Sequence, residues 1–414
     1  MNPNFKLTES DIKIRQENVL ELFYSGIKSQ ATKETLQRLL RYFLMNVCAD
    51  LLQGDFKQRA QQFVEIASED QTKATNIIIA YVKKLRERTA LDRSNQYYIN
   101  PSYLPNKIKP IKKLLVMNDV GLAWKRIYTF YPEKNNIHQG RGYTKEEISK
   151  LLEYSGTIDT DFIILASSSG GLRLGAWNGL RWADVFPIYH VEGKYKIELK
   201  DGEQGNVVCA GMVIYKSTPE QYTALISLEA WKKLQEYKKV WTKKMSRLPT
   251  DSDHLMLDRT SKMSITSKTV KGRMQKLLIK SGLRGPLTEG KRRHTVPATH
   301  GFRRYWDKVM MQTESTKGTL SALVIKERLL GHYGLVKTDK NYFWTDVLEH
   351  VPEYLQAMSD LMISDKYRLK EKLEEIEIEN QKLSQANYEK QLALGRLSEL
   401  EAKVERMQKY QVKP

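Results

Sequence analysis

The chain has 414 residues, with 68 lysines and arginines against 49 aspartates and glutamates, so its formal net charge is +19. This length is enough for two or three domains with cores of their own, and the positive excess makes a polyanion the expected partner, ahead of an anionic membrane surface. The sequence holds neither an uninterrupted apolar run of about 18 residues nor a signal-peptide core at its start, so we expect a soluble intracellular protein.

The sequence contains no clear metal-binding or nucleotide-binding motif. The two cysteines, Cys48 and Cys209, lie in apolar runs typical of buried reduced thiols rather than of a disulfide or a zinc site. The seven histidines form no HExxH motif and no Cys/His cluster with ligand spacing. The stretch GPLTEGK has the spacing of a nucleotide-binding loop, but Arg292 follows it where a Ser or Thr would bind magnesium. We therefore expect no cofactor.

Residues 1–132 are predicted to form a helical domain. Apolar residues recur every three or four positions in IRQENVLELFYSGI, TLQRLLRYFLMNVCADLL and TNIIIAYVKKLRER. The segment NPSYLPNKIKPIKKLLVM is rich in lysine and holds three prolines, so we expect a turn or a broken helix that presents positive charge, including Lys107 and Lys109. Residues 133–142 are polar and contain glycine, which is typical of a linker.

Residues 143–365 are predicted to form a second domain. It begins with a capping-box pattern, in which Thr144 is followed three residues later by Glu147. Residues 186–228 carry β-branched and aromatic runs bounded by Gly and Pro, as strands do, and helical periodicity returns in SLEAWKKLQEYKKVW and SKTVKGRMQKLLIKSG. The predicted fold class is therefore mainly α with a small β-sheet.

Residues 366–414 are predicted to form a coiled-coil oligomerisation tail. One heptad position carries mainly apolar residues, namely Leu369, Ile376, Leu383, Lys390, Leu397 and Val404. The position four residues on carries Leu373, Asn380, Asn387 and Leu394. The tail holds 11 basic and 9 acidic residues, which leaves 57 against 40 in residues 1–365, so the body carries the positive excess. The alternative is a long solvated helix without a partner.

An ordered set of residues in the second domain has the chemistry to hold one phosphodiester: Arg173, Lys216, His300, Arg303, His332 and Tyr342. Two guanidiniums bind non-bridging oxygens and stay charged at physiological pH, which suits the two arginines. A lysine on a hairpin can protonate a leaving 5′ oxygen, and histidines exchange protons near neutrality. A tyrosine phenolate keeps the phosphoryl bond as a phosphotyrosine ester.

These residues resemble the tyrosine recombinase (phage integrase) family, whose motif is Arg, Lys, His-x-x-Arg, His or Trp, then Tyr. The resemblance covers about residues 142–350. GLRLGAWNGLRWADV is similar to the family's first arginine box, THGFRRYW to the His-x-x-Arg box, and LLGH followed by KTDKNY to the closing box. One departure is Ala176, since an acidic residue commonly stands three positions after the first arginine. The resemblance implies an archaeal or mobile-element branch of the family.

Context selects among rival residues. Two other Gly-Leu-Arg tripeptides end at Arg181 and Arg284, but only Arg173 follows an apolar helix and precedes an LRW element at the family's spacing. Lys216 is preferred to Lys200 because it closes one strand and opens a turn, as the family's lysine does. For the nucleophile, the family's spacing from the closing-box histidine favours Tyr342 over Tyr305, Tyr333 and Tyr354.

The resemblance implies a site-specific recombinase that cleaves and rejoins DNA through a 3′-phosphotyrosyl intermediate, without metal or ATP, as in integration or excision. It also implies that residues 1–132 are a core-binding domain that clamps DNA. Two alternatives are a type IB topoisomerase, which is similar in the same residues, and a noncatalytic DNA-binding protein with a coiled-coil tail.

The expected partners are double-stranded DNA and further copies of the chain, as a dimer or tetramer on DNA. We expect no membrane partner and a cytoplasmic, DNA-associated protein. Basic side chains are the expected contacts to the phosphate backbone, namely Lys107, Lys109, Lys291, Arg292, Arg293 and Arg304.

Overall fold

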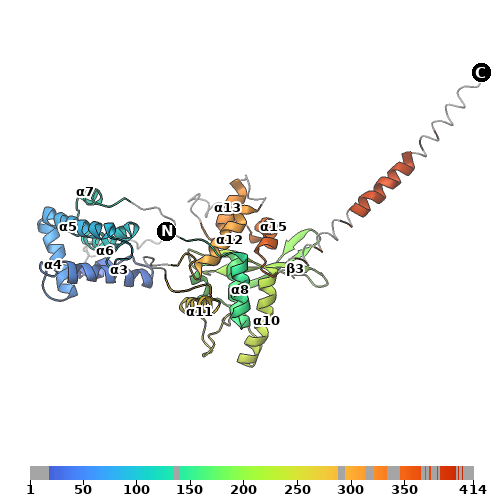
Figure 1. The fold of residues 1–414 in the computed structure, drawn as a ribbon, viewed down its shortest axis with the longest axis horizontal. Coiled ribbons are helices and arrows are strands. Elements are labelled where there is room, and N and C mark those ends of the chain that lie inside the picture. Colours follow the sequence, from blue (N-terminus) through green and yellow to red (C-terminus); the bar gives the residue numbers. More distant parts are fainter. Residues whose placement is uncertain are drawn as a thin grey trace, which may run out of the picture. The chain divides into compact units, whose positions relative to one another are not determined.

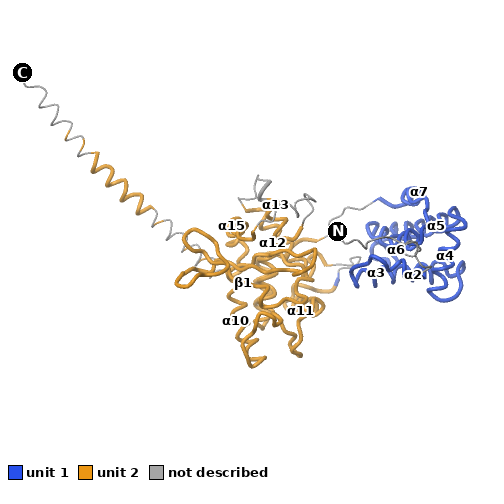
Figure 2. The backbone as a smooth tube through the Cα atoms, turned by 180° about the vertical axis from the view of Figure 1, so that it is seen from behind, with its two compact units in different colours: residues 1–138, 287–292 blue, residues 139–286, 293–414 orange. Residues whose placement is uncertain are grey.

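The computed structural model describes residues 18–133, 140–287, 294–313, 320–332 and 346–364, with residues 369, 373, 380, 383–397, 400 and 403 of the C-terminal segment (Figure 1). The chain divides into two compact units (Figure 2). Unit 1 comprises Met1–His138 with Leu287–Arg292, and unit 2 comprises Gln139–Pro286 with Arg293–Pro414. The tyrosine predicted as nucleophile, Tyr342, lies outside the described residues.

Unit 1 is helical throughout its described part. Its α-helices are α2 (Val19–Tyr24), α3 (Gln30–Tyr42), α4 (Phe56–Glu69), α5 (Gln71–Ala90), α6 (Leu104–Met117) and α7 (Trp124–Tyr128). A π-helical turn, Phe43–Val47, continues α3, and a 3-10 turn, Pro101–Tyr103, leads into α6. The apolar faces of these helices meet in one core whose fully buried members include Phe23, Phe43 and Phe63.

The segment predicted as a turn or a broken helix begins with a turn, Pro101–Tyr103, but α6 then continues through Pro110, so the predicted break in this helix was wrong. A proline inside a helix lacks the N–H that would bond to the carbonyl four residues earlier. Burial offsets that loss, because Pro110 lies among Ile108, Ile111 and Leu114 on the face that packs into the core of unit 1. The opposite face keeps the predicted positive charge, with Lys109 exposed.

Unit 2 combines helices with one small sheet. Its α-helices are α8 (Lys145–Ser155), α9 (Ile158–Gly170), α10 (Leu228–Met245), α11 (Ser267–Lys280), α12 (His300–Gln312), α13 (Leu320–Leu329) and α15 (Val351–Leu361). Its 3-10 turns are Leu174–Trp177, Trp182–Asp184 and Val347–His350. The predicted capping box at the start of α8 is confirmed, because Thr144 and Glu147 bond to each other's backbone N–H.

The sheet has four antiparallel strands in the order β2-β1-β3-β4: β1 (Val185–Val191), β2 (Lys194–Lys196), β3 (Asn206–Ile214) and β4 (Tyr222–Ser227). The strands of the β3–β4 pair run from Cys209 opposite Ser227 to Ile214 opposite Tyr222. A turn at residues 215–221 therefore closes this hairpin, and Lys216 lies in it. Mainly α with a small sheet is thus the fold class, as predicted.

Helix α9 is the central helix of unit 2, in contact with α8, α10, α12 and β4. In Figure 1, α12, α13 and α15 lie on one side of this unit and α8, α10 and α11 on the other. The side chains from Phe162 to Ser169 are all buried, which explains the continuous apolar and small-residue run. The helix ends at Gly170 and is capped by Gly171, whose φ of +58° is left-handed, and the chain then turns toward Arg173.

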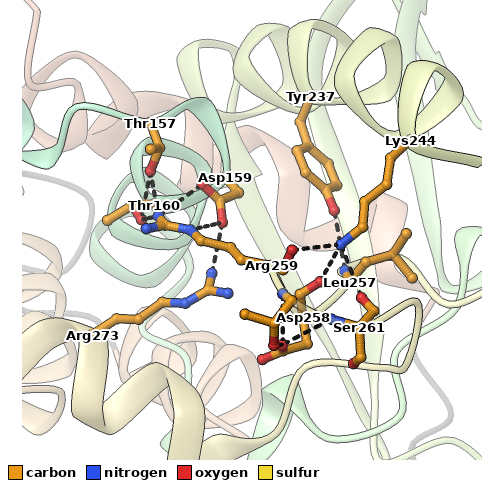
Figure 3. Close-up of polar contacts among 11 residues, drawn as sticks. Thr157, Asp159, Thr160, Tyr237, Lys244, Leu257, Asp258, Arg259, Ser261 and Arg273 are labelled. Carbon is orange, nitrogen blue, oxygen red and sulfur yellow. Dashed lines mark hydrogen bonds and ion pairs between the residues drawn. The ribbon is translucent and has the colours of Figure 1, made fainter.

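A network of ion pairs fixes the loop between α10 and α11 (Figure 3). The carboxylate of Asp159 on α9 accepts hydrogen bonds from Arg259 at 3.0 Å and from Arg273 at 2.6 Å. On the other side of the loop, the Lys244 ammonium donates to the carbonyls of Asp258 and Ser261. Asp159 on α9 and Lys244 on α10 thereby tie the loop to the body of unit 2, and Arg273 on α11 holds the Asp159 carboxylate.

Three further predictions concern single features of the chain. Cys48 and Cys209 are free and buried, as predicted. Within the described part of the chain, no helix is both long enough and apolar enough to span a membrane. Residues 383–397 are helical, and Leu383, Leu394 and Leu397 on this helix are 55 to 58% exposed.

Candidate phosphodiester-binding site

Arg173 lies at the start of the 3-10 turn that follows α9. Its Nη2 donates to the carbonyl of Gly331 at 3.1 Å, and its guanidinium carbon lies 5.6 Å from the centre of the Tyr222 ring. The first contact reaches the closing-box turn after α13, and the second reaches the first residue of β4. Arg173 thus joins three segments that are far apart in the sequence.

Arg303 lies on α12 and is only 4% exposed. Its Nη1 donates to the carbonyl of Gly171 at 2.7 Å, and its Nη2 donates to the carbonyl of Leu330 at 2.6 Å. Burial, and then the nearby Arg173 guanidinium, lower the pKa of Arg303 below its ordinary value. None of the hydrogen bonds described for these two guanidiniums goes to a carboxylate.

The hydrogen bonds of His332 assign its tautomer. Nε2 lies 2.9 Å from Nη2 of Arg303, and Nδ1 lies 2.8 Å from Oε2 of Glu327. A guanidinium can only donate, so Nε2 accepts and the ring proton sits on Nδ1, where it is donated to the carboxylate. Glu327 thus sets which nitrogen faces Arg303.

Two glycines let these segments approach closely. A Cβ on Gly171 would lie 2.9 Å from Cδ2 of Leu330, and a Cβ on Gly331 would lie 2.5 Å from the Tyr222 ring. Both glycines have left-handed φ values, +58° and +65°. Their carbonyls accept hydrogen bonds from Arg303 and Arg173 respectively, so the glycines of GGLR and LLGH hold the two guanidiniums in place.

His300 is the first residue of α12, one turn before Arg303. Burial, and then the positive charges of Arg304, Arg303 and Arg173, lower the pKa of His300 below its usual value. A neutral imidazole can accept a proton, although several neighbouring cations oppose its protonation. A bound anion would offset their positive charge and raise the pKa of the imidazole again. The predicted His-x-x-Arg pair thus lies on one face of one helix, near Arg173.

The two candidate lysines lie in different loops. Lys216 lies in the β3–β4 turn, and its Nζ is 3.0 Å from Oδ1 of Asp184. That turn begins with Tyr215, whose hydroxyl would lie 2.8 Å from a Cβ on Gly175, two residues after Arg173. Lys200 lies in the β2–β3 loop, where its backbone N–H donates to Glu203. The turn that carries Lys216 is the one in contact with the arginine box.

Ala176, the departure from the family pattern, is buried, and its N–H donates to the carbonyl of Arg173. It brings no charge to the site. The carboxylate nearest to the arginines through described hydrogen bonds is that of Glu327, which acts on Arg303 through His332.

The residues predicted to contact the DNA backbone divide between the two units. On α6, Lys107 lies over the rings of Tyr42 and Tyr103 at 5.1 and 6.0 Å, and burial, then Arg88 and Arg38, lower its pKa. Arg304 on α12 has its Nη1 buried beside Gly140. Lys109, also on α6, is exposed, and the other three, Lys291, Arg292 and Arg293, lie outside the described residues.

Three residues of the site were missed by sequence reasoning: Tyr222, Glu327 and Asp184. Tyr222 reads as an ordinary strand residue, since nothing along the chain reveals that its ring lies under Arg173. Glu327 lies one helical turn and a bend before His332, a spacing too common to be informative. Asp184 belongs to the LRWAD element that sequence analysis used only to select Arg173.

The arrangement has the chemistry of an oxyanion site. Two guanidiniums and two imidazoles lie together. The two guanidiniums repel each other in a partly buried site, and a bound anion would relieve this repulsion. Guanidiniums match the non-bridging oxygens of a phosphate bidentately. Among the described residues, no three His, Cys, Asp or Glu side chains are grouped to hold a metal ion.

No protein-family model and no curated protein matches the sequence. Among solved structures, the chain is similar to the Tn1549 transposon integrase in complex with transposon right end DNA, with 12% identity over 83% of this chain and 99% of that one, at a TM-score of 0.44. A lambda integrase dimer bound to a COC′ core site gives 13% identity, 82% and 88% coverage, and a TM-score of 0.41. XerA recombinase gives 17% identity, 78% and 96% coverage, and a TM-score of 0.33.

Proposed function

We propose that this protein is a site-specific DNA recombinase that cleaves and rejoins strands through a 3′-phosphotyrosyl intermediate, with Tyr342 as the nucleophile. The observation that carries the proposal is the convergence of Arg173, Arg303 and His332. These side chains come from three separate segments and meet through hydrogen bonds of 2.6 to 3.1 Å. A pair of guanidiniums without a carboxylate bonded to either is suited to the negative transition state of phosphoryl transfer.

The proposed step balances without an outside energy source. The Tyr342 phenolate oxygen forms a bond to phosphorus, the bond from phosphorus to the 5′ oxygen breaks, and Lys216 gives a proton to that oxygen. The phosphotyrosine ester keeps the energy of the broken phosphodiester, so attack by a 5′ hydroxyl reverses the step on a partner strand. The proposed cleavage step requires neither ATP nor a metal ion.

The two histidines have distinct proposed roles. His332 accepts from Arg303 in the free protein, and a phosphate oxygen that takes over Nη2 would leave Nε2 ready to be protonated and to donate to the phosphate. The carboxylate of Glu327 on Nδ1 would stabilise that imidazolium. His300, whose pKa is held low by burial and neighbouring arginines, would serve as a proton acceptor.

DNA binding and assembly complete the proposal. The excess of basic residues in positions 1–365, including Lys107, Lys109, Lys291, Arg292, Arg293 and Arg304, would bind the phosphate backbone. The exposed leucines of the 383–397 helix favour a coiled coil between copies of the chain. Strand exchange joins two DNA sites, which requires several protomers, and this tail would help to assemble them.

The experiment that tests the function is a covalent-adduct assay. Wild-type protein is incubated with nicked suicide duplexes, tiled across the DNA that flanks its gene, in EDTA and without nucleotide. We expect an SDS-resistant adduct with a subset of tiles and transfer of the trapped strand to a second duplex that offers a 5′ hydroxyl. Tight binding to the tiles without any adduct would contradict the proposal and favour a noncatalytic DNA-binding protein.

A further inference from the structure

Lys216 forms an ion pair with the buried carboxylate of Asp184. Its Nζ lies 3.0 Å from Oδ1 of Asp184, and the exposed fractions of the two side chains are 53% and 5%. The other oxygen, Oδ2, accepts from the backbone N–H of Arg181 at 2.8 Å. A buried carboxylate is strongly unfavourable unless it is paired. Oδ1 is buried and accepts no hydrogen bond of good geometry, so the ammonium is the charge that compensates it.

The turn that carries Lys216 has an unusual backbone. Tyr215 and Ser217, on either side of the lysine, have left-handed φ values of 55° and 62° although neither is a glycine. Such conformations are unfavourable for residues that carry a Cβ, so the surroundings must stabilise them. The turn is closed by hydrogen bonds from the N–H of Thr218 to the carbonyl of Tyr215 and from the N–H of Ser217 to Gln221.

The same turn is in contact with the arginine box. The Tyr215 ring packs at Gly175, and Tyr222, at the other end of the turn, lies under Arg173. The rings of Tyr215 and Tyr222 are themselves 6.2 Å apart. Asp184 comes from the 3-10 turn Trp182–Asp184 near the end of the arginine box, so the ion pair joins the lysine's turn to the chain segment that carries Arg173.

We propose that Asp184 is a positioning residue for Lys216: its buried carboxylate holds the ammonium and the β3–β4 turn beside the arginine box, from which the lysine reaches the leaving 5′ oxygen. This inference rests on the proposed function. No bond changes at Asp184 itself. The carboxylate limits the directions that a long, flexible side chain samples, and proton transfer depends on such placement.

The test separates placement of the proton donor from folding by changing the leaving group. Adduct formation is timed on the ordinary duplex and on one whose scissile 5′ bridging oxygen is replaced by sulfur, because a thiolate leaves without a proton. The variants are Asp184→Asn, Lys216→Ala and the two combined. Glu203→Gln is the matched control, since it removes the carboxylate of another lysine pair, with Lys196 at 2.6 Å, on the same sheet.

We expect Lys216→Ala to slow cleavage of the ordinary duplex about a hundredfold and Asp184→Asn about tenfold, with both near the wild-type rate on the sulfur duplex. The double variant should be no slower than Lys216→Ala, because Asp184 acts through the lysine. Equal slowing of Asp184→Asn on both duplexes would show a merely structural role and overturn the inference. So would an Asp184→Asn rate equal to that of wild type on the ordinary duplex.

A second measurement separates this inference from the proposed function. Hydrogen exchange of the backbone amides at residues 215–221 should speed up in Asp184→Asn and stay unchanged in Glu203→Gln. A wild-type protein that forms no adduct with either duplex would refute the proposed function. In that case, an unchanged rate of amide hydrogen exchange in Asp184→Asn would also refute the inference that Asp184 holds the β3–β4 turn in place. Faster exchange would support that inference.

Discussion

At the scale of single residues, Arg173 and Arg303 differ in how far they are buried. This difference decides at which of the two positions a substitution would test catalysis without also disturbing folding. Arg303 is enclosed and supplies donors to two backbone carbonyls, so its loss would also disturb packing. Arg173 is only partly buried and makes one described hydrogen bond through its side chain. Arg173 is therefore the better position at which to test the chemistry.

Arg173→Ala is expected to slow adduct formation about 10²- to 10³-fold, because it removes one guanidinium from the transition-state oxygens. The dissociation constant for DNA should rise by less than about fivefold, since one phosphate contact among many is lost. Single-turnover cleavage and a binding titration measure the two effects.

The matched control for Arg173→Ala is Arg181→Ala, in the neighbouring Gly-Leu-Arg. Its guanidinium donates to the carbonyl of Ser252, in the loop after α10. Cleavage by Arg181→Ala should stay at the wild-type rate. A large loss of DNA affinity in Arg173→Ala, with little change in the rate from bound complex, would instead identify Arg173 as a docking residue.

The sequence predicted the arginines and histidines of the site better than the residues that pack against them. Arg173, His300, Arg303 and His332 carry chemistry that spacing and order reveal, and the structure brings them together. Tyr222 could not be found in this way, because a ring under a guanidinium depends on strand register rather than on chain distance.

At the scale of elements, the loop between α10 and α11 depends on Asp159. Burial alone would raise the pKa of this carboxyl, but hydrogen bonds from Arg259 and Thr157 and the charge of Arg273 bring it below its usual value. Asp159→Asn should lower the free energy of unfolding by about 3 kcal/mol, because Arg273 is left buried without its anion. Urea unfolding measures this change.

The control for Asp159→Asn is Glu236→Gln, which breaks the exposed pair with Lys233 on α10. That change should stay within about 0.5 kcal/mol. If the two variants lost the same stability, the network in Figure 3 would not be what fixes the loop.

The junction before α15 is predicted to weaken in acid through His350. Burial, and then the charge of Arg328, lower the pKa of this histidine to about 4. The unfolded chain binds the proton more tightly, at about 6.5, so this contribution to stability is complete above that pH and is lost as pH falls toward 4. Between about pH 7.5 and pH 5 the loss is about 2 kcal/mol.

His350→Gln should remove this part of the pH dependence, whereas replacing the exposed His190 of β1 should leave it unchanged. Urea unfolding of the three proteins at both pH values is the measurement. An equally steep loss of stability in His350→Gln would show that other groups account for it.

Element type could be read from the sequence where one pattern dominates. The apolar run of α9 and the strand signals of residues 186–228 were correct predictions, and the α8 capping box forms as expected. Pro110 misled because the local preference against a helical proline is outweighed by burial, which only the tertiary fold supplies. The Asp159 network, from α9 to α11, could not be predicted because its members are about 100 residues apart.

At the scale of the whole molecule, DNA affinity and self-association are predicted to lie in different parts of the chain. The 11 basic and 9 acidic residues of the tail nearly cancel, so deleting residues 366–414 leaves the positive body almost unchanged. The shortened protein should bind DNA nearly as well as the full chain and should sediment as a monomer, whereas the full chain forms a dimer or larger assembly.

Analytical ultracentrifugation and a DNA titration at matched salt measure these two properties. Replacing Leu394 and Leu397 by serine in the full chain is the conservative counterpart, since it alters the heptad positions and keeps every charge. An unchanged mass after deletion of the tail would contradict the coiled coil and place self-association in the body.

The proposed reaction begins with attack by Tyr342, so the most direct measurement is to locate the protein atom that carries the DNA. Wild type and Tyr342→Phe are mixed with the suicide duplex that gives an adduct, and the trapped protein is digested with trypsin and analysed by mass spectrometry. We predict that the nucleotide mass lies on Tyr342 and that Tyr342→Phe binds the duplex normally without an adduct, because only the attacking oxygen is missing. An adduct formed by Tyr342→Phe, or a nucleotide mass on another residue, would contradict the account.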